Sequence, residues 1–275
     1  MFFWCALLAV ALGLCGCAAA SHDSVDESLA RMPAANDRPA SPESLDAPDG
    51  EVPGEETPPP PPQPSVQGVV CIDAGHGAIP DATLEPIGPG SSEMRPREPG
   101  GTSGATTGIP EYQVVLNVAL KLQRELEAQG ITVVMVRTEN NVNISSIERA
   151  AVANGCNADL FIRLHCDGST NPGVYGFTTL VPGYNGWTAP IVAESAKAAQ
   201  VMHPLIVAQT GAKDNGTVER NDLAGFNYSA VPALLFEMGY MSNAEEEQRL
   251  ISDAYQELLA KSISTATIAY LSQKG

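Results

Sequence analysis

The sequence predicts an α/β fold, a single three-layer domain with a mixed, largely parallel central sheet and helices on both faces. From about residue 68 onward, short β-branched or apolar runs alternate with amphipathic helical stretches, a pattern typical of sheets covered by helices. Hydrophobic residues make up 44% of the 275 residues, which is enough for a sizeable core. No internal repeat suggests a solenoid or propeller.

The predicted domain begins with a strand, a long loop and a helix. The run "GVVCID" (68–73) is a short buried strand that ends in a glycine-rich loop. Residues 78–108 are rich in Gly, Pro, Ser and Thr without apolar periodicity, so we expect a long loop, which in a compact domain is usually functional or mobile. A helix follows over 110–130, because apolar residues recur there at helical spacing between an initial proline and a final glycine.

A second strand, helix and strand follow. The run "ITVVMVRT" (131–138) is rich in β-branched residues and predicts a strand. Ser145 and Glu148 have the spacing of a capping box and predict the start of a short helix. The run "ADLFIRLHCD" (158–167) is the next predicted strand.

The last predicted elements are a helix, a strand and two further helices. Residues 191–211 are rich in alanine and predict a helix, which Pro204 must kink or split. The run "VPALLFEMG" (231–239) predicts a strand. Helices are then expected over 243–251, with an asparagine as its cap, and over 254–271.

Two segments precede the domain. Residues 1–17 are apolar and uncharged, as in a signal peptide, and their end resembles a bacterial lipoprotein signal with Cys17 as the lipidated residue. An ordinary cleaved signal peptide is the alternative, because Cys15 stands where a small Ala or Ser is usual. Residues 18–67 hold ten acids, two arginines and half of the 22 prolines, which predicts a disordered acidic linker. We therefore expect an exported domain, residues 68–275, tethered by lipid at the outer face of a membrane or in the cell wall.

Charge and cysteine usage limit the partners and the redox chemistry. The formal net charge of −17 argues against nucleic acid as a partner, since phosphate binding needs clustered Lys and Arg. Outside the signal peptide the cysteines are Cys71, Cys156 and Cys166. An exported domain can form one disulfide from the three, for example Cys71–Cys166 between strands, or keep all three reduced and buried.

Four residues stand where an α/β sheet usually holds its ligands. His76 and His165 each follow a predicted strand at its carboxyl end, and Glu237 closes an apolar strand, where a carboxylate needs compensation. Glu111 opens the first helix, where stabilisation of the helix dipole is the alternative role. Two His and one Glu, with water in the fourth position, are a common hydrolytic zinc set, and a further Glu then serves as general base. His203, beside a proline in a predicted helix, is expected at the surface or behind the ligands.

Four motifs together resemble a known family. The runs "CIDAGHG", "GIPEYQVVLNVALKLQRELEAQGITVVMVRT", "SSIERAAVANGCNADLFIRLHCD" and "VPALLFEMGYMSNAEEEQRL" resemble, in order and spacing, the zinc-dependent N-acetylmuramoyl-L-alanine amidases of bacterial cell-wall autolysins. The resemblance implies one Zn²⁺ ion held by His76, Glu111 and His165, with Glu237 as the catalytic residue. It further implies hydrolysis of the amide between N-acetylmuramic acid and L-alanine in peptidoglycan, in cell-wall turnover or cell separation.

The chain departs from the family beside the second histidine. The family usually has a small or aliphatic pair where Arg163 and Leu164 stand. Strand alternation puts Arg163 on the same side as His165, so it either reaches the substrate or forms a structural salt bridge. By resemblance, Arg220 and Asn221 lie in a segment that lines the substrate groove and are further candidate contacts.

Two rival functions follow from the same residues. A zinc peptidase acting on the stem peptide is one, but a His-x-x-Glu ligand pair is absent because Ile79 stands in its second position. A catalytically inactive wall-binding or regulatory module of the same fold is the other, but such a module typically lacks a ligand or the catalytic Glu, and all four residues are present.

Overall fold

The computed structural model describes residues 66–274. The predicted signal peptide with Cys17, and the predicted linker up to residue 65, lie outside the described residues. No helix in the described part is long and apolar enough to span a membrane. The elements in chain order are β1 (Val69–Ala74), β2 (Asp81–Pro86), β3 (Met94–Glu98), α1 (Glu111–Glu127), β4 (Thr132–Met135), α2 (Ser146–Gly155), β5 (Leu160–Asp167), β6 (Phe177–Pro182), α3 (Val192–Thr210), β7 (Asp214–Arg220), α4 (Ala224–Asn227), β8 (Ala233–Tyr240), α5 (Ala244–Leu250) and α6 (Asp253–Leu271).

The central sheet is mixed and largely parallel, as the sequence predicts. Its strand order is β4-β1-β5-β8-β6-β7. The strands β4, β1, β5 and β8 run parallel, while β6 pairs antiparallel with β8 and parallel with β7. The carboxyl ends of β1, β5 and β8 therefore meet at one edge. This edge brings together residues from three distant parts of the sequence.

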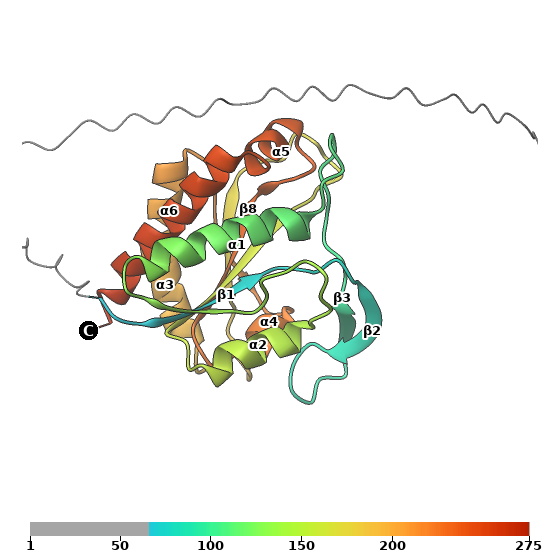
Figure 1. The fold of residues 1–275 in the computed structure, drawn as a ribbon. Coiled ribbons are helices and arrows are strands. Elements are labelled where there is room, and N and C mark those ends of the chain that lie inside the picture. The colour runs from blue at the N-terminus through green and yellow to red at the C-terminus, as the bar shows by residue number, and fades with distance from the viewer. Residues whose placement is uncertain (1–65, 275) are drawn as a thin grey trace, which may run out of the picture. The chain divides into compact units, whose positions relative to one another are not determined.

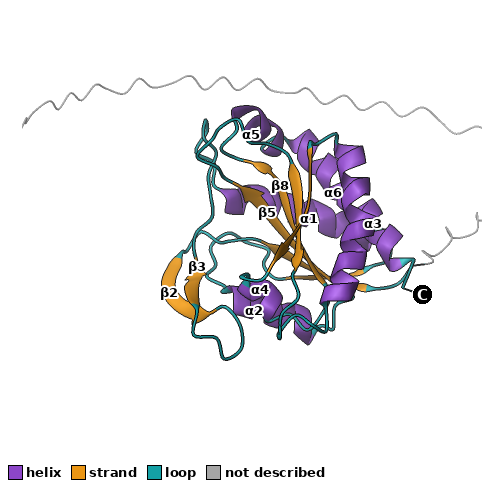
Figure 2. Ribbon diagram, turned by 180° about the vertical axis from the view of Figure 1, so that it is seen from behind, coloured by secondary structure: helices purple, strands orange, loops and turns teal. Residues whose placement is uncertain are grey.

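Helices cover both faces of the sheet, which confirms the predicted layers. The long helices α1, α3 and α6 lie on one face, and α2 with α4 on the other (Figures 1 and 2). The helix α1 buries Val115, Ala119, Leu122 and Leu126, the stripe on which its prediction depends. At about 25 cal/mol per Å² of apolar surface, such a stripe contributes several kcal/mol of burial free energy.

Three parts of the structure differ from the expectation. The predicted loop 78–108 contains the antiparallel strands β2 and β3, which the sequence hides because β2 is mostly exposed and lacks apolar alternation. The strands β6 and β7 were not expected either. In β6, every residue is buried although the run includes two threonines and a proline. The helix α3 is one continuous element with Pro204 inside it, so the proline does not split it.

The three described cysteines are free thiols. Cys71 packs in the core under α2, whereas Cys166 packs in the core under α1 and α6. The two side chains thus point to opposite faces of the sheet. A Cys71–Cys166 disulfide, one of the pairings that the sequence left open, is therefore not formed.

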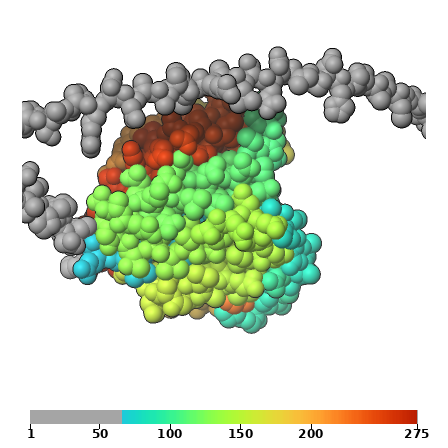
Figure 3. Space-filling view, viewed as in Figure 1, coloured from blue at the N-terminus to red at the C-terminus, as the bar shows by residue number. Residues whose placement is uncertain are grey.

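The β2–β3 hairpin is fixed to α2. Arg97 in β3 pairs with Asp81 in β2 at 3.3 Å and with Glu148 in the first turn of α2 at 3.1 Å. Figure 3 shows the blue-green surface of the hairpin continuous with the yellow-green surface of α2. The predicted capping box of α2 is formed, with Ser145 and Glu148 bonding reciprocally. These contacts hold the end of β3, Glu98, next to the end of β1.

Candidate metal centre

His76 follows β1 in a strained backbone conformation. Its φ is +59°, the left-handed region that side chains rarely adopt. Gly75 precedes it with no room for a side chain, because the ring of His165 occupies the position that a Cβ would take. The ring nitrogen Nδ1 of His76 lies 2.9 Å from Glu98 Oε1. When His76 donates this hydrogen bond, Nε2 keeps a free lone pair.

Glu111 opens α1 and points into the same site. It is 2% exposed, and each carboxylate oxygen accepts a backbone N–H: Oε1 from Cys166 at 3.0 Å and Oε2 from Thr102 at 2.9 Å. The loop that carries Thr102 approaches closely at Gly101, whose φ is +73° and where a Cβ would meet both Glu111 and His76. The carboxylate is therefore held in one orientation, which a helix-dipole role alone would not require.

The second histidine completes a set of three potential ligands. Glu111 Oε1 lies 3.1 Å from His165 Nδ1, and Glu111 Oε2 lies 3.4 Å from His76 Nε2. In a tetrahedral zinc site with bonds of about 2.0–2.1 Å, neighbouring ligand atoms stand about 3.3–3.4 Å apart. Ligand atoms of the three residues all lie within 4.8 Å of one another. The arrangement fits one zinc ion, and in the described part of the chain no other His, Cys, Asp or Glu group is placed to hold a metal.

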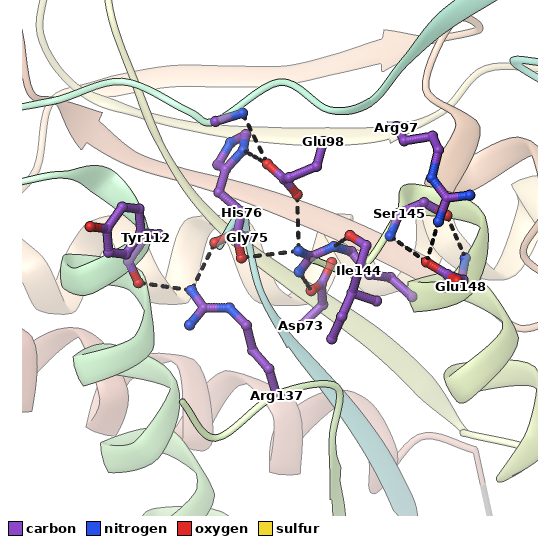
Figure 4. Close-up of polar contacts among 12 residues, drawn as sticks. Asp73, Gly75, His76, Arg97, Glu98, Tyr112, Arg137, Ile144, Ser145 and Glu148 are labelled. Carbon is purple, nitrogen blue, oxygen red and sulfur yellow. Dashed lines mark hydrogen bonds and ion pairs between the residues drawn. The ribbon is translucent and has the colours of Figure 1, made fainter. Parts of the chain in front are cut away.

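A buried ionic network supports His76 from behind (Figure 4). Arg149 in α2 donates to Asp73 at 2.6 Å, to Glu98 at 3.1 Å and to the His76 carbonyl at 3.0 Å. Both Arg149 and Asp73 are essentially inaccessible to solvent. Because burial of either charge alone is costly, the pair holds the ends of β1 and β3 in a fixed relation.

Arg137, after β4, ties the same turn to the first helix. Its guanidinium donates to the carbonyl oxygens of Gly75 and Tyr112 at 2.9 and 2.8 Å (Figure 4). It also donates to the carbonyl oxygen of Ala74 at 2.7 Å. Burial lowers the pKa of Arg137 to about 10, so it remains charged at neutral pH. The turn that carries His76 is thereby connected to the helix that carries Glu111.

Glu237 stands beside the three candidate metal ligands. On the parallel strands β5 and β8 it is paired in register with His165. It lines a cavity of about 200 Å³ together with His76 and His165, and its Oε2 is buried without a hydrogen-bond partner among the described residues. An unpartnered carboxylate oxygen facing a cavity at a metal site is suited to accept a proton from a bound molecule.

The protonation tendencies of the site have identifiable causes. Burial raises the pKa of Glu237 well above its usual range, and the carboxylates of Glu111 and Asp167 add to the rise. Burial also lowers the pKa of His165, which favours the neutral, ligating form. For His76, burial opposes the charged form, but the Glu98 hydrogen bond and the charge of Glu111 outweigh it and raise the pKa. A cation at this position would offset the crowding of carboxylates.

Two of the three candidate substrate contacts line the cavity, and the third does not. Arg163 and Arg220 both line the cavity that contains Glu237. Asn221 directly follows β7, is exposed and packs against Gly183, which follows β6. It is not among the residues that line this cavity. His203 is buried under β6, between Thr179 and Asp214, and lies away from the ligand set.

Sequence reasoning missed four residues that hold the ligands in place. For Asp73 a signal exists, since an acid inside an apolar strand needs a cationic partner. For Arg137 and Arg149 the signal is weaker, because arginine is common in strands and helices at surfaces. Glu98 gives no signal in the sequence, because it stands in a stretch without apolar periodicity.

Comparisons with known proteins agree with this geometry. The model of the family described as N-acetylmuramoyl-L-alanine amidase matches residues 70–269. An N-acetylmuramoyl-L-alanine amidase of Mycobacterium tuberculosis is 28% identical over 216 residues, which cover 75% of this chain and 88% of that protein. The N-acetylmuramoyl-L-alanine amidase LytC of Bacillus subtilis is 27% identical over 207 residues, 75% of this chain but only 36% of the relative.

Solved structures of N-acetylmuramoyl-L-alanine amidases are also similar to this chain. The N-acetylmuramyl-L-alanine amidase Ami1 of Mycobacterium smegmatis superposes with a TM-score of 0.68 at 26% identity, covering 75% of this chain and 97% of that one. The N-acetylmuramoyl-L-alanine amidase of Clostridium difficile 630 superposes with a TM-score of 0.63 at 30% identity, covering 77% and 100%.

Proposed function

The chain belongs to the N-acetylmuramoyl-L-alanine amidase family, and on that premise we propose that it is a zinc enzyme whose single ion is held by His76, Glu111 and His165. It hydrolyses the amide bond between N-acetylmuramic acid and L-alanine in peptidoglycan. The observation that carries the zinc proposal is the spacing of 3.1 Å and 3.4 Å between the Glu111 oxygens and the two imidazoles. Bound there, zinc supplies Lewis-acid polarisation of the scissile carbonyl and lowers the pKa of the attacking water.

Glu237 moves the proton in this proposal. Its carboxylate takes a proton from the water that attacks the lactyl–alanyl carbonyl, and the resulting carboxylic acid gives that proton to the amine of the departing L-alanine. The partner-free Oε2 and the register opposite His165 support this role.

The identity of the bond that is cut tests the proposal. Purified peptidoglycan digested by the zinc-loaded protein should yield a glycan with free lactyl carboxylates and stem peptides with free alanine amines, identified by mass spectrometry. A chelator should stop the release, and added zinc should restore it. New termini inside the stem peptide would instead identify a zinc peptidase, and the absence of any product would identify an inactive wall-binding module.

We further propose that residues 1–17 direct export, that Cys17 carries a lipid anchor and that residues 18–67 form the tether. The domain would then act at the outer face of the membrane or in the cell wall. The lipoprotein-like end of the apolar segment supports this proposal. A spacer of roughly 50 residues with flexible-chain statistics reaches several tens of ångströms from a membrane surface.

Replacing the proposed lipidation site should release the protein. When the full chain is produced in a bacterium, the wild type should partition into the detergent phase of a phase-separation assay, and Cys17→Ser should move to the aqueous phase. Cys15→Ser is the matched control and should stay with the detergent. Retention of Cys17→Ser in the detergent phase, or release of both variants alike, would contradict lipidation at Cys17.

A further inference from the structure

Arg163 is a buried arginine with most of its hydrogen-bonding capacity unused. It is 4% exposed, and within the described residues its single hydrogen bond runs from Nε to Asp73 Oδ2 at 2.9 Å. Arg149 already donates to the other oxygen of Asp73 at 2.6 Å. The terminal nitrogens Nη1 and Nη2 of Arg163, which carry four donors, therefore have no protein partner there.

Arg163 lines two cavities. One is the cavity of about 200 Å³ that contains His165 and Glu237. The other, of about 260 Å³, lies between the hairpin and the 220–224 segment and contains Arg163 but neither of those residues. The guanidinium lies against Gly225 of α4, where a Cβ would collide with it. The backbone at this point thus leaves space for Arg163 to extend between the two cavities.

Paired charges line the second cavity. Its walls hold three arginines, Arg95, Arg163 and Arg220, against the two carboxylates Glu85 and Asp222. Asp222 is neutralised by Arg220, which pairs with it through two hydrogen bonds of 2.8 Å, and it also lies 3.5 Å from Arg95. Arg95 and Arg220 are partly exposed and paired with acids, so Arg163 is the buried cation of this wall. Its Nη donors, which no residue of the described part accepts from, suit an anionic ligand group beside the reacting groups.

The distance between the scissile bond and Arg163 limits which anionic group of the substrate this arginine can bind. Arg163 and His165 are two positions apart on one side of β5, so their Cα atoms stand about 6.6 Å apart. In an extended peptide, the alanine nitrogen of the scissile bond and a carboxylate on the next α-carbon stand about 6 Å apart. The two spacings are comparable, and Arg163 lines the same cavity as His165, so a substrate whose carbonyl lies at the candidate metal ligands has that carboxylate within the range of Arg163.

We propose that Arg163 is a specificity-determining residue that binds the free carboxylate of the stem-peptide residue following L-alanine. This inference rests on the proposed function, because it places the scissile carbonyl at His76, Glu111 and His165. The enzyme should accordingly distinguish stem peptides that carry this carboxylate from those in which it is converted to a carboxamide. A planar, forked guanidinium suits two-point recognition of a carboxylate, and the carboxamide lacks the charge and one acceptor.

Two substrates that differ in one group test the inference. The zinc-loaded full chain is assayed with N-acetylmuramoyl-L-alanyl-D-glutamate and with its D-isoglutamine counterpart. The wild type should favour the carboxylate substrate by about ten- to a hundredfold in kcat/KM, the range of one charge-assisted hydrogen-bonded contact. Arg163→Met should bring the ratio near one, and Arg163→Lys, which keeps a charge for Asp73, should give an intermediate ratio.

Two other arginines serve as controls. Arg124→Met removes a positive charge from the exposed face of α1, away from both cavities, and its ratio should equal that of the wild type. Arg220→Met tests the competing candidate. If the ratio collapses in Arg220→Met but persists in Arg163→Met, the assignment to Arg163 is wrong. A wild-type ratio near one also overturns the inference while leaving the amidase function intact.

A binding measurement separates recognition from catalysis. Calorimetry with the product dipeptides, L-alanyl-D-glutamate and L-alanyl-D-isoglutamine, should show the same preference in the wild type and its loss in Arg163→Met. If the Met variant fails to fold, the wild type and Arg163→Lys still give both ratios. Cleavage of neither substrate by the wild type would count against the proposed function, whereas equal dipeptide affinities would count against the role of Arg163.

Discussion

Glu237→Gln should lower kcat for amide hydrolysis by about 10²–10⁴-fold while one zinc ion per chain is retained. A positioned general base contributes a factor of this size, and glutamine has nearly the same shape but cannot accept the proton. Because Glu237 is not one of the three residues grouped around the metal position, the ion should remain. Muropeptide turnover and metal content, measured on the same preparation, check both halves of the prediction.

A carboxylate elsewhere on the surface provides the control. Glu219→Gln changes an exposed residue of β7 and should leave both turnover and metal content at wild-type values. Full activity in Glu237→Gln would refute the assignment of the base, and loss of zinc from that variant would place Glu237 among the ligands.

The same variant should be more stable than the wild type in the metal-free state. Burial raises the pKa of Glu237 in the folded protein above the ordinary value of 4.5. Between these two pKa values the folded state binds more protons than the unfolded state, so wild-type stability falls as pH rises through that interval. Glutamine lacks this titration. The Tm advantage of Glu237→Gln should therefore be present at pH 7 and vanish at pH 4 or below.

The central architecture and the grouping of the four candidate residues were predictable because they depend on local signals. His76, His165 and Glu237 each end an apolar run, and parallel strands bring their carboxyl ends to one edge. Glu111 follows the proline that begins an amphipathic helix, and the physical pattern alone left it between a ligand and a dipole-stabilising role. Only the two backbone N–H groups that hold its carboxylate decide its orientation.

The supporting residues were not predictable because their partners are distant in sequence. Glu98 belongs to a short exposed strand and becomes meaningful only when the hairpin folds onto α2 and meets His76. Arg149 resembles any helical arginine until the sheet places Asp73 against it, 76 positions away in the sequence. The strand β6 is hidden for another reason, since its threonines and final proline weaken the apolar signal although every residue is buried.

Compensating buried charges explain how the chain accommodates Arg163 where the family usually has a small or aliphatic residue. Asp73 bonds with Arg149 and with Arg163, and Glu98 is shared by Arg149 and His76. The two carboxylates and two arginines balance without a further ion. The chain therefore accommodates a second buried cation beside the site, and its terminal nitrogens have no hydrogen-bond partner among the described residues.

His76→Ala should reduce zinc affinity by about 10²–10³-fold or more and abolish peptidoglycan cleavage at ordinary zinc concentrations. Structural zinc sites with four protein ligands bind the ion with about 10–16 kcal/mol, which is about 2.5–4 kcal/mol for each ligand. Competition with a chromogenic chelator measures the affinity directly, independently of turnover. Wild-type affinity in this variant would exclude His76 as a ligand.

Two further variants separate ligation from support. His203→Gln alters a buried histidine outside the ligand set and should bind zinc as the wild type does. Glu98→Gln leaves all three ligands present but weakens the acceptor that orients His76, and loss of such support typically costs 10–100-fold in metal affinity. We therefore expect zinc affinity to be highest in the wild type and His203→Gln, lower in Glu98→Gln and lowest in His76→Ala. An affinity of Glu98→Gln equal to the wild type would show that Arg137 and Arg149 position the His76 backbone sufficiently without the carboxylate.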